Sequence, residues 1–159
     1  MIHFRDQLWM NANFQPMIST YLIYLVSSIL LAISALHFYW ALGGQWAVKA
    51  VIPEVMEGMF NENHKSRAAF YTLVVAVGLI VLALIIISNL PIISWLSDSW
   101  SSLGAKIIGS IFLLRALGDF KWVGFFKKPS ESIFARNDTM IYSPLCLFLG
   151  IGSWLIGLL

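Results

Sequence analysis

The sequence contains little cysteine and little charge, and both shortages exclude classes of function. Among its 159 residues Cys146 is the only cysteine, so no disulfide can form within the chain and no Cys-x-x-Cys pair is present for redox work or zinc binding. The missing second cysteine also argues against a four-span, quinone-linked thiol oxidoreductase. Charged residues make up 11% of the chain and the formal net charge is +2, so a nucleic-acid partner is not expected.

Catalytic motifs are missing as well. The chain has no glycine-rich phosphate loop, no His-Glu-x-x-His pattern and no Gly-x-Ser-x-Gly elbow. Its three histidines are not placed at a helical spacing that would bring two of them to one metal ion or haem. No metal site is therefore predicted, the cofactor is unknown, and no catalytic residue is assigned.

Apolar sequence is what the chain has in abundance. Hydrophobic residues make up 59% of it and the mean hydropathy is +0.81, which is too apolar for an ordinary soluble domain. A helix needs roughly 20 apolar residues to cross a bilayer. Four apolar runs of about this length cover residues 17–42, 68–88, 103–119 and 140–159. The sequence thus predicts a single membrane domain over residues 1–159, an all-α integral membrane bundle of four helices.

Basic residues are concentrated in the two long loops, residues 43–67 and 119–139. With four spans these loops lie on the same side of the membrane, and they hold Lys49, Lys65, Arg67, Lys121, Lys127, Lys128 and Arg136. The opposite side has Arg5 and Lys106. Because cytoplasmic loops are enriched in Lys and Arg, both loops are predicted to be cytoplasmic and both termini to lie on the outer side.

Polar residues from distant parts of the chain are predicted to gather at this cytoplasmic end. Ionisable groups at membrane depth are expensive and are candidates for function. The candidate ligand-binding residues are His37, Tyr39, Trp40, Glu54, Arg115, Asp119, Arg136, Asp138, Tyr142 and Ser143. Each also has a structural explanation, because every helix ends somewhere and polar side chains collect at helix ends.

Arg115 illustrates the two explanations. It lies four residues before Asp119, so on a continuing helix the two side chains share a face and can close the helix end as an ion pair. Alternatively, the guanidinium presents its two parallel N–H donors to a carboxylate or phosphate headgroup.

The other candidates leave a similar choice open. His37 fits a structural hydrogen bond near the membrane interface, or proton transfer beside a carboxylate. Asp138 precedes the predicted fourth span and can be its N-cap, with Thr139 as a competing cap, or it can contact a ligand. Lys127 and Lys128 are most simply explained as contacts with anionic lipid.

Several motifs together resemble a known family. They are His37-Phe38-Tyr39-Trp40-Ala41-Leu42-Gly43-Gly44, Pro53, Arg115-Ala116-Leu117-Gly118-Asp119-Phe120, Gly124-Phe125-Phe126, Phe134-Ala135-Arg136-Asn137-Asp138-Thr139 and Ser143-Pro144-Leu145-Cys146. The combination, over roughly residues 17–159, is similar to a family of small bacterial four-span integral membrane proteins described only as a domain of unknown function. The resemblance implies a multi-pass protein of the bacterial inner (cytoplasmic) membrane, and it implies no activity.

The leading hypothesis is a cytoplasm-facing polar pocket that binds an amphiphilic ligand, such as a lipid, isoprenoid or quinone headgroup, with acid–base chemistry left open. Arg115 would hold an anionic group, and His37 with Asp119 or Asp138 would supply hydrogen bonds or protons. The alternative is a non-enzymatic subunit of a membrane complex, or a homo-oligomer, whose glycine-containing helix faces meet a partner. A small channel built from several copies ranks last, because the second span offers almost no polar residue. The expected partners are thus membrane lipids and a partner subunit or second copy.

Overall fold

The computed structural model describes residues 4–52, 65–93, 95–128, 130 and 132–159. Within these ranges the regular secondary structure is helical, without a strand. In chain order the elements are α1 (Phe4–Ala41), α2 (Val48–Val51), α3 (Lys65–Ile87), α4 (Asp98–Leu117), α5 (Ile133–Asn137), the π-helix η3 (Asp138–Tyr142) and α6 (Ser143–Leu158). The prediction of an all-α fold is confirmed.

In the described part of the chain, four helical segments are long and apolar enough to cross a membrane. They are Pro16–Ala41, Ser66–Ile87, Asp98–Leu117 and Ile133–Leu158, of 26, 22, 20 and 26 residues. The last segment runs continuously through α5, η3 and α6. All four lengths suffice for the apolar core of a bilayer, so the prediction of four helices able to span a membrane is confirmed.

The last segment begins earlier than the sequence predicted. It starts at Ile133 instead of residue 140, because the hydroxyl of Ser132 accepts a hydrogen bond from the N–H of Ala135 at 3.0 Å and caps the helix there. Asp138 therefore lies inside a continuous helix. The prediction that Asp138 is an N-cap is wrong.

The third segment also begins before the predicted boundary. α4 starts at Asp98 instead of residue 103, and its first turn is polar and mostly exposed. An acidic side chain in the first turn interacts favourably with the helix dipole, which explains why these polar residues are helical. Hydropathy alone does not detect such a turn.

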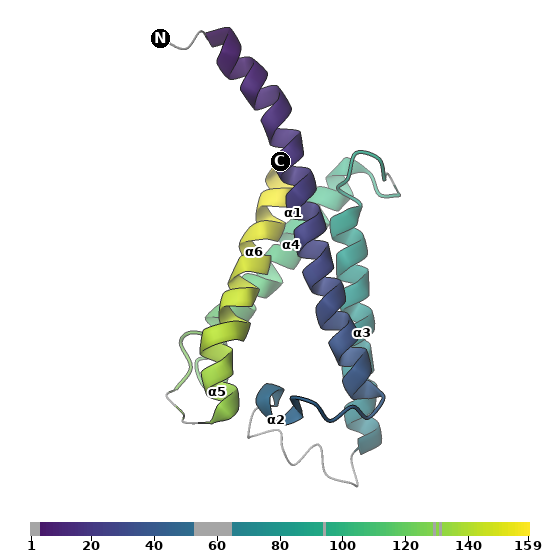
Figure 1. Cartoon of the computed structure of the whole chain (residues 1–159), viewed down its shortest axis with the longest axis vertical. Helices are drawn as coiled ribbons and strands as arrows, with labels where there is room; N and C mark the ends of the chain where they lie inside the picture. Colours follow the sequence, from purple (N-terminus) through teal and green to yellow (C-terminus); the bar gives the residue numbers. More distant parts are fainter. Residues whose placement is uncertain (1–3, 53–64, 94, 129, 131) are drawn as a thin grey trace.

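The helices are arranged as two pairs. α1 packs chiefly against α3, and α4 chiefly against α6, with smaller contacts between α1 and α6 and between α3 and α4. The pairs approach each other near the C-terminus and diverge toward the end that holds α2 and α5 (Figure 1). The bundle is thus two closely packed helix pairs that meet over part of their length.

Glycine residues allow α4 and α6 to lie close together. A Cβ atom on Gly109 would lie 2.8 Å from the carbonyl oxygen of Gly150, and one on Gly157 would lie 2.8 Å from the carbonyl oxygen of Ser102. Both distances are shorter than van der Waals contact, so a larger residue would force the helices apart. The hydroxyl of Ser102 uses this proximity and donates a hydrogen bond to the Gly157 carbonyl at 2.6 Å.

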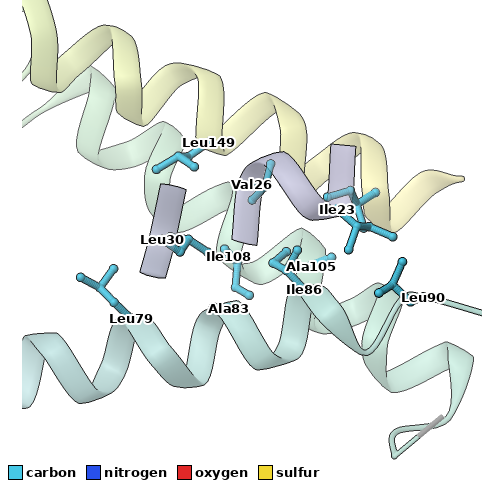
Figure 2. Packing of buried hydrophobic residues seen from close by; sticks show 11 residues of the cluster. Ile23, Val26, Leu30, Leu79, Ala83, Ile86, Leu90, Ala105, Ile108 and Leu149 are labelled. Carbon is cyan, nitrogen blue, oxygen red and sulfur yellow. The ribbon is translucent and has the colours of Figure 1, made fainter. Parts of the chain in front are cut away.

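An apolar cluster joins the two pairs. Figure 2 shows its side chains facing one another from α1, α3, α4, α6 and the connection between α3 and α4. The buried members are Ile23, Val26, Leu30, Leu79, Ala83, Ile86, Leu90, Ala105, Ile108, Leu149 and Ile156. Because lipid tails are as apolar as these side chains, the cluster stabilises a membrane bundle by close packing more than by removing apolar surface from water.

The two ends of the bundle differ in what they carry. The C-terminus and the connection between α3 and α4 lie at one end, and α2, α5 and the connection after α4 lie at the other (Figure 1). We call this second end the loop pole. It is the part of the molecule where most of the candidate residues lie.

Candidate functional site

The connection after α4 folds back onto the end of that helix. Gly118 and Gly124 both have φ near +90°, a conformation that side chains with a Cβ rarely adopt. The N–H of Phe125 returns to the carbonyl oxygen of Ala116 at 2.9 Å. A Cβ atom on Gly124 would overlap the carbonyl oxygen of Leu117, so this close return requires glycine.

The side chain of Asp119 stabilises the same connection by accepting hydrogen bonds from the backbone that follows it. Its Oδ1 atom accepts hydrogen bonds from the N–H groups of Trp122 at 2.7 Å, Val123 at 3.0 Å and Lys121 at 2.9 Å. These three bonds lower the pKa of Asp119 from 3.8 to about 2, because each stabilises the ionised carboxylate. Asp119 therefore organises its own turn, and the expected ion pair with Arg115 is replaced by a different one.

Arg115 pairs with Asp138 instead. The Oδ1 atom of Asp138 accepts a hydrogen bond from Nη2 of Arg115 at 2.9 Å. Its Oδ2 atom accepts from Nζ of Lys127 at 2.9 Å and from the N–H of Gly124 at 2.8 Å. The carboxylate thus joins α4, the connection after it and the last helix. Lys127 and Gly124 complete this Asp138 cluster, although the sequence indicated neither as a partner of Asp138.

A π-helical turn begins at Asp138. The N–H of Ser143 donates to the carbonyl oxygen of Asp138, five residues earlier, and so closes the wide turn. Pro144 follows directly and has no N–H with which to continue an α-helical ladder at this point. π-Turns inside α-helices occur frequently at functional sites. Here the turn contains the residue whose carboxylate reaches α4.

Two cations flank one carboxylate, so the Asp138 cluster has an excess of positive charge. The side chain of Asp138 is completely buried, that of Lys127 is 7% exposed and that of Arg115 is 33% exposed. A buried carboxylate is costly unless charges and hydrogen bonds compensate it, and Asp138 has both. Within the described residues the two cations share this single counter-charge, which favours a further anionic group beside them.

Of these two cations, Arg115 retains donor capacity. Besides Asp138, the ammonium of Lys127 donates to the hydroxyl of Thr139 at 2.6 Å and to the carbonyl of Gly124 at 3.2 Å. The buried Nη1 atom of Arg115, in contrast, has no hydrogen-bond partner among the described residues. The completely buried hydroxyl of Ser143 also has none there. These two groups and the hydroxyl of Ser153 on α6 are thus buried polar groups that the described residues leave without a hydrogen-bond partner.

His37, Tyr39 and Trp40 form a separate structure at the end of α1. The Nδ1 atom of His37 lies 2.8 Å from the carbonyl oxygen of Ile33, one turn earlier in the same helix, and the ring stands edge-on to Trp40. Trp40 donates its indole N–H to the carbonyl of Trp46 at 2.8 Å, and the Tyr39 hydroxyl accepts the N–H of Trp46 at 3.3 Å. The contacts described for these residues are local and do not include the Asp138 cluster.

The remaining candidates are dispersed. The hydroxyl of Tyr142 donates to the carbonyl of Ala50 at 3.2 Å and so connects the last helix with α2. Arg136 is exposed on α5. Glu54 lies outside the described residues. Within those residues, no group of three His, Cys, Asp or Glu side chains is arranged to hold a metal ion.

Four helices able to span a membrane, with an ion cluster at one end of them, define a small multi-pass helical membrane protein. Residues 30–153 match the family described as protein of unknown function DUF3995, and the chain belongs to this family. The resemblance to a family of unknown function is therefore confirmed. The matched range contains all members of the Asp138 cluster. No curated protein and no solved structure matches the chain.

Proposed function

We propose that the protein binds an amphiphile through an anionic or strongly polar oxygen of its headgroup, and that Arg115 is the residue that holds this oxygen. The proposal rests on the observation that only one of the two Nη atoms of Arg115 has a hydrogen-bond partner among the described residues. Nη2 is fixed on Asp138 at 2.9 Å, whereas the buried Nη1 has no partner among the described residues. A buried donor without a partner costs free energy that a ligand oxygen would recover.

Asp138 and Lys127 support the proposed role without contacting the ligand. Asp138 holds the guanidinium in one orientation, and Lys127 together with the Gly124 N–H holds the carboxylate. Such a pre-oriented donor loses little entropy on binding. The surplus positive charge of the cluster further favours an anionic group, and burial strengthens that attraction.

The ligand classes that fit are a lipid, an isoprenoid or a quinone headgroup, with the apolar tail beside the helices. The proposal is one of binding, because the carboxylate of Asp138 is engaged by three donors and His37 is bonded within its own helix. Acid–base chemistry has no support in these contacts.

The proposed location is the cytoplasmic side of a bacterial inner membrane. The loop pole carries Arg67, Lys121, Lys127, Lys128 and Arg136, whereas Lys106 lies toward the opposite end of α4. The excess of basic residues near short loops favours the cytoplasm for the loop pole and the outer side for both termini. A reporter fused after Leu159 should therefore be active outside the cytoplasm, and cytoplasmic activity would overturn this orientation.

Native mass spectrometry of gently purified protein tests the binding proposal. The wild type should carry a defined added mass, and Arg115→Lys should lower its occupancy about tenfold, because a lysine keeps the charge but cannot serve Asp138 and a ligand oxygen together as a planar fork does. Arg136→Gln is the matched control, because it removes an exposed arginine at the same pole. Wild-type protein without any added mass, seen only as a discrete oligomer that the substitutions leave unchanged, would contradict the proposal and favour a subunit of a membrane assembly.

A further inference from the structure

The connection after α4 has an inner and an outer side with different roles. Its inner side consists of the Gly124 N–H and the ammonium of Lys127, both of which contact Asp138. Its backbone is fixed by three N–H bonds to Asp119. The outer side chains therefore project from a rigid support, and they are not needed for any of these contacts.

The outer side is aromatic. Phe120 is 65% exposed and Phe126 is 61% exposed, and their ring centroids lie 6.2 Å apart. Trp122 and Phe125 are also exposed. Exposed aromatic rings at the end of a membrane helix are typical of the interface, where the ring lies at the level of the lipid headgroups.

Lysine residues accompany these rings. The ammonium of Lys121 lies 5.2 Å from the centroid of the Trp122 ring, and Lys128 is exposed at the other end of the connection. We call the exposed side chains of this connection, those of Phe120, Lys121, Trp122, Phe125, Phe126 and Lys128, the aromatic–basic face. The face begins three residues after Leu117, where the segment of α4 that is able to span a membrane ends, so a bilayer crossed by α4 would have its headgroups at the level of this face.

From this placement we infer that the aromatic–basic face binds the phosphate of anionic phospholipids, with its rings at the boundary between headgroups and tails. Charge complementarity and position both favour a lipid over a soluble acidic partner, because the spans already hold the face at the membrane surface. Two lysines near an anionic surface strengthen the interaction by about fivefold each, or roughly thirtyfold together. This inference goes beyond the proposed function, since it concerns Lys121 and Lys128 and not Arg115.

The test compares two lipids with identical acyl chains, phosphatidylglycerol and phosphatidylcholine, titrated onto the purified protein in neutral detergent. Native mass spectrometry gives the first binding constant for each lipid. The wild type should prefer phosphatidylglycerol, and Lys121→Gln/Lys128→Gln should lower that affinity by up to about fivefold per lysine, the upper value for an exposed ion pair, while leaving phosphatidylcholine unchanged. Both lysines are exposed, so the variant is expected to fold, which its helical content and thermal unfolding verify.

Two controls separate this face from other cationic sites. Arg67→Gln removes an exposed cation from the loop-pole end of α3, and it should leave the preference for phosphatidylglycerol intact. Arg115→Lys should also leave it intact while lowering about tenfold the occupancy of the added mass that the proposed function predicts. Equal affinity of the wild type and the double lysine variant for phosphatidylglycerol would overturn the inference, as would competition by millimolar inorganic phosphate, which would indicate a site for a free anion.

Discussion

The two helix pairs differ in how they are held together. Side-chain hydrogen bonds cross from α4 to the last helix at Ser102–Gly157, Trp154–Ser110 and Arg115–Asp138. Among the described residues, α1 and α3 share one such bond, from the hydroxyl of Ser34 to the carbonyl of Ala76 at 2.7 Å. The comparison shows that α1 and α3 form a largely apolar support, whereas α4 and the last helix carry the charged Asp138 cluster and the π-helical turn. We therefore propose that the function lies on α4 and the last helix.

Removing the negative charge of Asp138 should change the stability of the bundle more than any other substitution proposed here. Asp138→Asn leaves Arg115 and Lys127 without the carboxylate that both contact, and should lower the free energy of unfolding by about 3–5 kcal/mol. Asp98→Asn, which changes an exposed carboxylate at the other end of α4, is the control and should lower it by no more than about 1 kcal/mol, the upper value for a charge that interacts with the helix dipole at an exposed site. Denaturant titration in mixed micelles measures both, and equal stability of the two variants would show that the Asp138 cluster is not a stabilising unit.

Inserting a methyl group between α4 and α6 should lower the stability by a smaller amount. Gly109→Ala places a Cβ atom against the Gly150 carbonyl and should cost about 2 kcal/mol, because the helices must move apart. Gly78→Ala on α3 meets nothing within 4 Å and should be neutral or stabilising by up to about 1 kcal/mol, since alanine favours helix. Thermal unfolding of both variants checks the difference. A destabilised Gly78→Ala would mean that α3 also depends on a close contact.

Removing a single hydroxyl hydrogen bond between two helices should lower the stability even less. Ser34→Ala removes the bond between α1 and α3, and Ser102→Ala removes a comparable bond between α4 and α6. Each should cost about 0.6 kcal/mol, the typical value of a hydrogen bond between membrane helices. Similar losses would show that the contrast between the pairs comes from the ion cluster. A loss several times larger for Ser34→Ala would contradict the description of α1 and α3 as a pair held mainly by apolar packing.

Acid pH should have the smallest and most local effect. The pKa of Asp119 is lowered from 3.8 to about 2, so the stabilisation that its ionised form gives to the turn is complete above pH 3.8 and is lost as the pH falls through about 2. The chemical shift of the Asp119 carboxyl carbon, followed by NMR between pH 5 and pH 1, should titrate near pH 2. A midpoint near the ordinary value of 3.8 would show that the three N–H bonds do not form in solution.

Most of the fold could be predicted from the sequence, and the failures have a common cause. Apolar runs of sufficient length identify membrane helices, because lipid tolerates few polar side chains. The ends of the helices were predicted less well. Ser132 caps the last helix in a polar segment, and Asp98 lies in a polar first turn, so neither boundary coincides with a change in hydropathy.

The site was predicted only in part. Arg115 and Asp138 are both among the predicted residues, but the spacing of Arg115 and Asp119 on one helix indicates Asp119 as the only partner of Arg115 within the chain, beside the alternative of a ligand headgroup. The helix ends at Leu117, and the glycine conformation at Gly118 directs Asp119 into its own turn. Pairing across 23 residues depends on how α4 packs on the last helix, which local spacing does not specify. Gly118 and Gly124, on either side of this turn, were the one local signal that the chain folds back onto the end of α4.

The most direct test of the central claim is the mass of whatever the protein retains on purification, compared between the wild type and Arg115→Lys at matched collision energies. The account predicts a discrete amphiphile on the wild type and about a tenth of that occupancy on the variant, with Arg136→Gln resembling the wild type. Equal occupancy in all three proteins would show that Arg115 does not hold the headgroup, and would contradict the function proposed for this pole.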